Sequence, residues 1–332
     1  MKNMMARVCS LLLAVAMLIG CVMLSSCGDD RKKIVIYTSA EDFRIEYMQK
    51  QLNAKFPQYN IIIEYKSSGD HAATLKSAGT NAPCQITHDL EYGYAAELAA
   101  AGVLADLGGL VDFTNFTRDT TLSTYYAPEL RNGGAIIVNK AVLEEKGLPM
   151  PTSYEDLLNP VYKDLISMPN PKASGTGYMF LLSLVNAWGE EAAFAYFDQL
   201  AENVLSFTSS GSGPVNALVG KEVAIGLGMT AHGVQEINNG ENLEVIFFEE
   251  GSPYSLYGQG IIAGHETDEA VVEVFKYMVS ELTVELCGNF YPEKIFADID
   301  FELENYPKNI PYADMSNNTP ERKAELLAKW MH

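Results

Sequence analysis

Two segments in the middle of the chain place small polar residues directly before a predicted helix. Residues 169–177 read Pro-Asn-Pro-Lys-Ala-Ser-Gly-Thr-Gly before the apolar run 178–185, and residues 208–214 read Thr-Ser-Ser-Gly-Ser-Gly-Pro before the run 215–219. Small residues at a helix start expose unpaired N–H groups at the positive end of the helix dipole, which suits an anionic group. We therefore predict an anion-binding clasp that includes Ser174, Gly175, Thr176, Ser209 and Ser210.

Each of these loops, taken by itself, also fits a capped surface turn. Lys172 lies in the first loop and is a candidate cation for the clasp, although a solvated lysine would fit the same position. The presence of two such loops in one region is what favours the anion clasp.

Polar residues also follow three predicted strands near the N-terminus, at 34–37, 61–65 and 85–90. In open parallel sheets, ligands bind beyond the carboxyl ends of the strands. We therefore expect polar residues at these strand ends to lie on one edge of a sheet and to contact ligand; they are Thr38, Ser39, Ser68, Gly69 and Asp89. Helix capping is the alternative role of these residue types.

The sequence carries no motif that points to bond-making chemistry. It contains no GxSxG, no Walker A sequence, no HExxH and no CxxC. Residues 226–231 match GxGxxA after a predicted strand, but no acidic residue ends a following strand as a dinucleotide site requires. We therefore expect no enzymatic activity, no cofactor and no metal site.

The elements that must position these loops alternate between strand and helix. Helix patterns at 41–56 and 71–78 separate the three strands, and another at 94–101 follows the third, which predicts an α/β fold with a parallel sheet. A second α/β set lies between strand-like segments at 134–139 and 260–264. We therefore expect one lobe, 131–254, inserted into another that consists of residues 34–130 and 255–332 and includes the C-terminal helices.

Length and charge narrow the possible functions. The chain has 332 residues, more than one hydrophobic core usually serves, so two domains are expected. Its formal net charge is −20, which argues against nucleic acid or an anionic bilayer as the partner of the folded domain.

The N-terminus resembles a bacterial lipoprotein signal. Lys2 and Arg7 precede an apolar run, 8–24, that leads into Ser25, Ser26 and Cys27. We expect residues 1–26 to be removed, Cys27 to carry lipid, and residues 27–33 to tether an exported domain to the outer side of the cell membrane. Leu18-Ile19-Gly20-Cys21 also fits a lipid site and is the alternative.

Two further cysteines, Cys84 and Cys287, remain in the predicted mature domain. An exported compartment permits a disulfide, but sequence alone does not bring two distant sulfur atoms together. Two buried free thiols and one disulfide therefore both stay open.

Four segments resemble the periplasmic-type solute-binding proteins of ABC importers, in the branch of ferric-iron, thiamine, phosphonate and sugar-phosphate binders. They are Tyr-Thr-Ser-Ala at 37–40 and the stretches 151–158, 168–176 and 220–227, and the resemblance covers residues 34–330. It implies a type 2 periplasmic-binding-protein fold, in which each of two lobes is a mixed sheet flanked by helices and two crossing strands form the hinge. It also implies a monomer that closes over one small solute and delivers it to a membrane permease.

The same resemblance bears on the ligand. Ferric-iron members carry adjacent tyrosines just after the strand equivalent to 223–227, where this chain has Thr230 within Gly-Met-Thr-Ala-His. The serine-rich loops resemble the phosphate-gripping loops of phosphonate and sugar-phosphate binders, so an anionic phosphorylated or phosphonate solute is favoured. Ferric iron, or a cationic solute such as thiamine or a polyamine bound by Glu41, Asp89 and Glu91, is the alternative. A sensory or enzymatic secreted lipoprotein is the alternative class.

Overall fold

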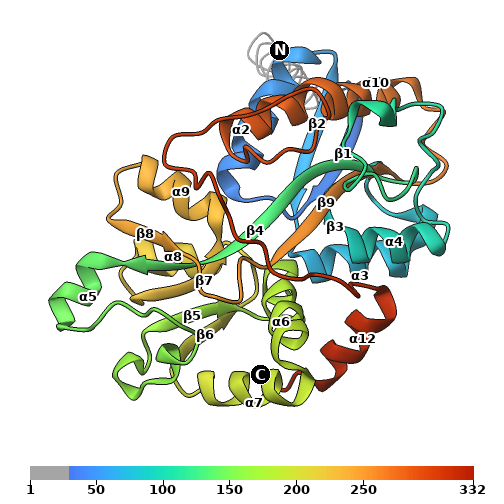
Figure 1. The fold of residues 1–332 in the computed structure, drawn as a ribbon. Helices are drawn as coiled ribbons and strands as arrows, with labels where there is room; N and C mark the ends of the chain where they lie inside the picture. Colours follow the sequence, from blue (N-terminus) through green and yellow to red (C-terminus); the bar gives the residue numbers. More distant parts are fainter. Residues whose placement is uncertain (1–29) are drawn as a thin grey trace, which may run out of the picture.

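The computed structural model describes residues 30–332, and the predicted leader, Cys27, Cys21 and residues 27–29 of the tether lie outside this range. A nine-stranded sheet runs through both halves of the molecule in the order β2-β1-β3-β9-β4-β7-β5-β6, with β8 paired to β4 (Figure 1). The three N-terminal strands are parallel to one another, as the alternating pattern predicts. They are β1 (Lys32–Thr38), β2 (Tyr59–Tyr65) and β3 (Ile86–Glu91).

Helices cover both faces of the first lobe's sheet. Along β1, Ile34 and Ile36 belong to one core cluster, while Val35 and Tyr37 belong to another. Because side chains alternate across a strand, this division shows that both faces of β1 are buried. The helices of this lobe are α2 (Asp42–Lys55), α3 (Ser68–Ala78), α4 (Tyr92–Ala100), α10 (Glu269–Tyr277) and α11 (Thr283–Asn289), with a π-helical turn at Met278–Leu282.

The second lobe is built around α6 (Gly175–Trp188). Every residue of α6 from Gly175 to Val185 is buried, because this apolar helix packs inside the core cluster formed with the strands of its lobe. The strands are β5 (Ile166–Pro169), β6 (Val204–Thr208), β7 (Ile225–Met229) and β8 (Leu243–Ile246). The other helices are α5 (Lys140–Lys146), α7 (Glu190–Leu200), α8 (Gly213–Val219) and α9 (Thr230–Asn238). Short 3-10 turns lie at Gly79–Asn81, Phe113–Asn115, Asp156–Leu158 and Pro160–Tyr162.

Two antiparallel strands connect the lobes, β4 (Ala127–Asn139) and β9 (Tyr254–Ile261). Residues 127–133 of β4 pair with β9, and residues 134–139 pair with β7 and β8, so one strand passes from one sheet into the other. The strand patterns at 134–139 and 260–264 predict this crossing, but β4 begins seven residues earlier and β9 extends from 254. The polar residues Glu129 and Asn132 are buried in the additional part of β4, and this burial is what the pattern does not reveal.

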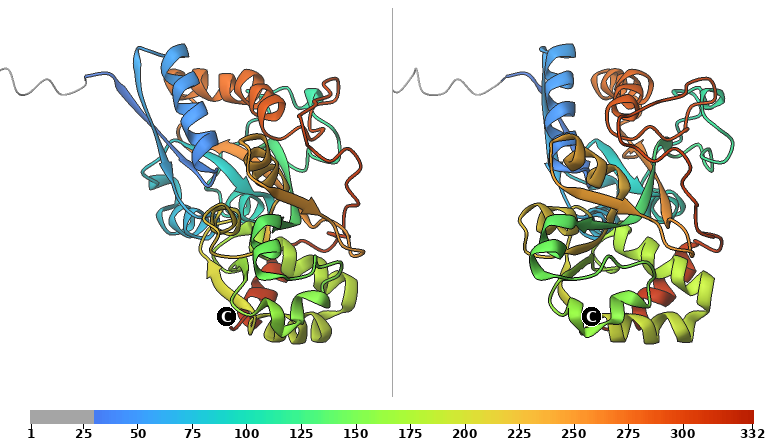
Figure 2. Two further views of the ribbon diagram at one scale, coloured as in Figure 1. Left: turned by 90° about the vertical axis from the view of Figure 1, so that its left-hand side faces the viewer. Right: turned by 60° about the vertical axis from the view of Figure 1, so that its left-hand side comes forward.

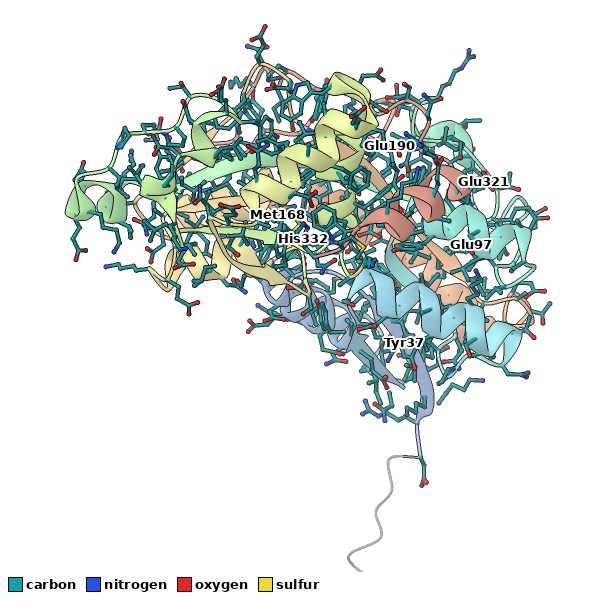
Figure 3. All side chains as sticks on the ribbon, turned by 90° about the horizontal axis from the view of Figure 1, so that it is seen from below. Tyr37, Glu97, Met168, Glu190, Glu321 and His332 are labelled. Carbon is teal, nitrogen blue, oxygen red and sulfur yellow. The ribbon has the colours of Figure 1, made fainter. Side chains whose placement is uncertain are left out.

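The C-terminal helix α12 (Pro320–Lys329) differs from the expected arrangement, which assigns it to the first lobe. Leu326 and Trp330 pack in the core cluster of the second lobe, while Lys323 forms an ion pair with Glu91 at the end of β3 in the first. Figure 2 shows the C-terminal segment running from one lobe to the other, and Figure 3 shows the helix that carries Glu321 beside the helix that carries Glu97. The buried side chain of Trp330 at the end of α12, rather than the hydrophobic periodicity of the helix, determines where α12 lies. Among the described residues, no helix is long and apolar enough to cross a membrane.

Candidate functional site

A small cavity of about 20 Å³ lies where the two lobes meet. Such a volume holds about one water molecule. A larger hollow of about 510 Å³ is lined by the first lobe alone, so it does not join the lobes. The interlobe cavity is lined by both lobes and both crossing strands: Ser39, Glu41, Tyr65, Ser68, Asp89, Asn132, Ser174, Thr176, Ser210, Gly211, Ser212, Met229 and Tyr257.

The wall from the first lobe consists of residues at strand ends. Ser68, at the start of α3, donates from Oγ to Ser39 Oγ over 3.1 Å, and Ser39 Oγ lies 3.0 Å from Asp89 Oδ2. Asp89 has a backbone φ of +54°, a left-handed conformation that Asp and Asn adopt more readily than most residues. Ser67 caps α3 by accepting from Asp70 N. The carboxyl ends of β1, β2 and β3 therefore meet at this edge, as the parallel-sheet rule predicts.

The wall from the second lobe begins at α6. Ser174 is the N-cap of this helix, and its side chain accepts from Gly177 N over 3.5 Å. The loop before α8 lies directly against it, because a Cβ at Gly211 would stand only 2.4 Å from Thr176 Oγ1. The hydroxyls of Ser210 and Ser212 are 3.1 Å apart. The two predicted loops of the clasp are thus brought together at one wall.

The lobes touch across the cavity. Gly69 N donates to the carbonyl oxygen of Ala173 over 3.2 Å. A Cβ at Gly69 would lie 2.8 Å from the backbone oxygen of Lys172, closer than real Cβ contacts allow. Tyr65 of the first lobe is also hydrogen-bonded to Ser210 of the second lobe. This hydrogen bond lowers the pKa of Tyr65, but the larger effect of burial raises it. This arrangement is a closed one.

A buried ion cluster lies behind the first-lobe wall. The Arg44 guanidinium contacts Glu41 at 2.5 Å, Asp89 at 2.6 Å and Glu129 at 3.2 Å, and each of the four side chains is at most 6% exposed. His88 Nε2 lies 3.0 Å from Glu129 Oε1. Arg44 is therefore fully engaged by protein carboxylates.

Burial has opposite outcomes for the carboxyl groups of this cluster. Burial raises the pKa of Asp89. Burial and the negative charge of Asp89 together raise the pKa of Glu129. Burial also acts to raise the pKa of Glu41, but Arg44 and His232 outweigh it and the pKa is lowered. Burial and the Arg44 charge lower the pKa of His88, which is therefore a neutral partner of Glu129. Three carboxyl groups thus share one positive charge.

Six of the residues predicted to bind ligand line the cavity: Ser39, Ser68, Asp89, Ser174, Thr176 and Ser210. Gly69 and Gly175 are not in the lining but allow close approach; a Cβ at Gly175 would lie 2.6 Å from the Tyr257 hydroxyl. The remaining three predicted residues lie outside the lining. They are Thr38, whose hydroxyl is bonded to His88 Nδ1, Ser209, which is exposed, and Thr230, which is fully buried.

Other lining residues have no signal in the sequence. Asn132 and Tyr257 come from the crossing strands and reach the cavity because of the β4–β9 register. Lys172 does not serve the clasp, since its Nζ donates to the carbonyl oxygen of Trp330 over 2.7 Å. Cys84 and Cys287 are both buried free thiols. Within residues 30–332 there is no group of three or more His, Cys, Asp or Glu residues that could hold a metal ion.

Comparison with known sequences finds a matching family model and several relatives. A sequence model of bacterial extracellular solute-binding proteins matches residues 124–318. An uncharacterised protein of Haemophilus influenzae is 26% identical over 77% of this chain and 75% of its own length. A putative 2-aminoethylphosphonate-binding periplasmic protein of Salmonella typhimurium is 24% identical over 50% of this chain. The phosphoglycerate transport regulatory protein PgtC of the same species is 24% identical over 40%. The chain spans about half of the phosphonate relative's length and 32% of PgtC.

Solved structures share the whole fold. The periplasmic binding protein AfuA from Actinobacillus pleuropneumoniae, with fructose-6-phosphate bound, has a TM-score of 0.80 at 20% identity, covering 91% of this chain and 98% of AfuA. A periplasmic thiamin binding protein has a TM-score of 0.74 at 15% identity, over 91% and 96% of the two chains. Iron-bound HitA from Pseudomonas aeruginosa has a TM-score of 0.69 at 16% identity, over 90% and 98%. With its two lobes and crossing strands, the chain therefore belongs to the bacterial extracellular solute-binding proteins of ABC transporters, which bind solutes and are not enzymes.

Proposed function

We propose that this protein captures a small phosphorylated or phosphonate solute between its lobes and delivers it to an ABC permease. The observation that carries this proposal is the convergence of hydroxyl groups from both lobes on one cavity, beside the starts of α3 and α6. Neutral hydroxyls and the N–H groups of a helix start are suited to a phosphate group.

The lining itself supports an anion held by neutral donors. Among the described residues that line the cavity there is no Lys, Arg or His. Arg44, which contacts the lining residues Glu41 and Asp89, and Lys172, two residues before Ser174, are engaged elsewhere, by three carboxylates and by the Trp330 carbonyl. Two sequence relatives are named for a phosphonate and for phosphoglycerate, and the AfuA structure holds a sugar phosphate.

Capture requires the lobes to move. A cavity of about 20 Å³ does not admit a solute, so the Gly69–Ala173 contact must open and re-form. Bending at β4 and β9 provides the opening, and a ligand that contacts both lobes shifts the population toward the closed state. One chain contains both walls of the site, so we expect a monomer.

A cationic solute is the second candidate, because Glu41 and Asp89 also line the cavity. Thermal-shift measurements on the purified protein separate the candidates. The ligands are inorganic phosphate, 2-aminoethylphosphonate, 3-phosphoglycerate, fructose-6-phosphate, ferric citrate, thiamine and spermidine. A ligand at about 100 times its Kd adds about 2.7 kcal/mol of stability. A response to ferric citrate, thiamine or spermidine alone would contradict the proposal.

A matched pair of variants tests the serine loop. Ser210→Ala removes a hydroxyl that lines the cavity, whereas Ser209→Ala removes an exposed one next to it. Loss of one hydrogen bond to a charged group costs about 1.5–3 kcal/mol. We expect Ser210→Ala to weaken phosphate or phosphonate binding by at least about tenfold and Ser209→Ala to leave it unchanged. Equal affinities of the two variants would remove the loop from the site.

We also propose that Cys27 carries the lipid that holds the protein at the outer side of the cell membrane. The support is the sequence pattern of residues 1–27. Cys27→Ser should release the protein from the membrane fraction, and Cys21→Ser should not. The reverse result would assign the lipid to Cys21.

A further inference from the structure

The two serine hydroxyls of the first-lobe wall donate away from the cavity. Ser39 Oγ donates to the carbonyl oxygen of Asp89 and lies 3.0 Å from Asp89 Oδ2. A carbonyl oxygen only accepts, so the single hydroxyl proton of Ser39 is committed to Asp89. Ser68 Oγ must then donate its own proton to Ser39 Oγ, over 3.1 Å. Ser68 therefore presents lone pairs, and not a proton, to the cavity that it lines.

The carboxyl groups of the same wall already have donors. Glu41 Oε2 accepts from Arg44 Nε and Glu41 Oε1 accepts from the Tyr291 hydroxyl, each over 2.5 Å. Asp89 Oδ1 accepts from Arg44 Nη2 over 2.6 Å, and Asp89 Oδ2 accepts from Ser39. Three carboxyl groups share the one positive charge of Arg44, so the wall disfavours a second negative charge on the solute.

Asn132 Oδ1 is an acceptor without a donor. The Asn132 side chain lines the cavity and is 4% exposed, and its Oδ1 has no hydrogen-bond partner within residues 30–332. Burial raises the pKa of the neighbouring Tyr257, whereas a hydrogen bond with Asn132 acts to lower it, as a bond donated by the Asn132 amide does. The amide NH2 group is thus engaged and Oδ1 is not. A buried acceptor without a donor costs free energy, so the site is complete only when a solute brings a donor to Oδ1.

The second-lobe side of the cavity has the opposite character. Ser174 Oγ accepts from Gly177 N at the start of α6, so its own hydroxyl proton remains available to a solute. Tyr65, Ser210 and Ser212 are linked by two hydrogen bonds, which use two of their three hydroxyl protons and leave one for a solute. Donors therefore lie on the second-lobe side, and acceptors lie on the first-lobe wall and on β4.

We propose that the site selects a phosphate or phosphonate group that keeps one proton. The unprotonated oxygens accept hydrogen bonds from the second-lobe side, and the P–O–H group donates to Asn132 Oδ1. A fully ionised group would set its lone pairs against those of Asn132 and Ser68, and a sulfonate, which has no proton near neutral pH, would do the same. Asn132 thus determines specificity for the protonated form. The inference rests on the proposed function, since it assumes that the hydroxyl groups bind the anion.

Phosphorus compounds and their sulfur counterparts test the retained proton by calorimetry on the purified protein. The pairs are inorganic phosphate with sulfate, 2-aminoethylphosphonate with 2-aminoethanesulfonate, and fructose-6-phosphate with fructose-6-sulfate. The two members of a pair are similar in shape, but only the phosphorus compound keeps a proton on part of its population near neutral pH. We expect each phosphorus compound that binds to do so at least about tenfold more tightly than its sulfur counterpart, equivalent to about 1.4 kcal/mol.

The pH profile separates a retained proton from a simple preference for higher charge. The second pKa of a phosphate ester is about 6, and the singly protonated fraction falls about tenfold per pH unit above it. The affinity of the wild-type protein should fall in the same proportion above the second pKa of the ligand. The ionisable side chains at or directly behind the cavity are Glu41, Tyr65, Asp89 and Tyr257, and Arg44, His88 and Glu129.

The variant Asn132→Leu removes the acceptor at similar volume and leaves all of these ionisable groups in place. We expect it to reduce the preference for phosphorus over sulfur compounds to less than about threefold and to flatten the pH profile. Ser209→Ala, which removes an exposed hydroxyl, is the control and should keep both properties. If Asn132→Leu does not fold, the wild-type pairs and the wild-type pH profile still test the retained proton.

The outcomes are distinct. An affinity that stays constant or rises above the second pKa of the ligand would show that the dianion binds, and equal affinities within a pair would show that no proton is needed. Either result would overturn the inference and leave an anion-binding site standing. A pH profile that is the same in Asn132→Leu and in the wild type would overturn the role of Asn132. Failure of every phosphorus compound to bind would overturn the proposed function, and the inference with it.

Discussion

Replacing Gly69 by alanine should block closure of the lobes without destabilising either of them. Gly69 is the second residue of α3, and its amide donates to Ala173 O on the opposite lobe over 3.2 Å. The added Cβ would stand 2.8 Å from Lys172 O and 3.3 Å from Ala173 Cα. Both are backbone atoms, so the clash is not relieved by rotating a side chain.

The magnitude follows from these contacts. Ordinary contact at this Cβ needs at least about 3.4 Å, so the lobes must stay apart, and the hydrogen bond across them, worth about 0.5–1.5 kcal/mol, is lost. If the lobes close against the clash instead, strain from overpacking costs about 1–3 kcal/mol. We take about 2 kcal/mol as the cost of closure, which corresponds to about 30-fold weaker binding. Alanine favours a helix over glycine by about 0.5–1 kcal/mol, so α3 itself should not be weakened.

The assay is calorimetry with the solute that gives the largest thermal shift, together with urea unfolding and small-angle scattering. Gly109→Ala is the matched control, because a Cβ there meets nothing within 4 Å. Gly69→Ala should bind about 30-fold more weakly, unfold at the same or higher urea concentration without ligand, and show a smaller compaction on binding. Unchanged affinity and full compaction would refute the assignment of the Gly69 contact to the closed state.

Three further predictions concern buried groups. Lys323→Met should lower the free energy of unfolding by about 3–5 kcal/mol in urea titrations, because it leaves the buried Glu91 without its ion-pair partner. The control is Lys329→Met, at an exposed lysine, which should lower the free energy of unfolding by less than about 1 kcal/mol. Equal losses in the two variants would contradict this prediction. Burial lowers the pKa of His71 to about 3. Because the unfolded chain binds the proton first, stability falls as pH drops from about 6.5 toward 3, by about 1.4 kcal/mol per pH unit, and His71→Asn should remove that part of the slope. Burial raises the pKa of Cys84 to about 12, so its thiol should react with a thiol reagent only after unfolding, and rapid reaction in the native protein would contradict its burial.

The sequence is informative wherever the signal is local. The β-branched run at 34–37 predicts β1, and the polar residues before apolar runs predict the start of α6, where the structure shows Ser174 as the cap. Hydrophobic periodicity and capping depend on residues a few positions apart, so they can be recognised from the sequence without knowledge of the fold. The family resemblance extends this to the two-lobed arrangement, which the solved structures share.

Local sequence patterns do not predict the burial of polar residues in the crossing strands. Glu129 and Asn132 look like surface residues in the sequence, yet both are buried in β4. Asn132 reaches the cavity only because β4 pairs with β9 in a particular register. A buried polar group in such a strand depends on distant partners, as Glu129 depends on Asp89 N and on Arg44, and no local pattern records them.

The sequence by itself determined the alternating elements, the clasp loops and the polar strand ends, because each depends on neighbours along the chain. Tertiary structure alone decided which polar groups remain available to a solute. It directs Lys172 to the Trp330 carbonyl and Arg44 to three carboxylates from separate elements, and it leaves Asn132 Oδ1 without a partner in the described chain. The physical reason is that charge pairing and burial are properties of groups brought together in space, and the electrostatic character of a cleft is what remains after those pairs are formed.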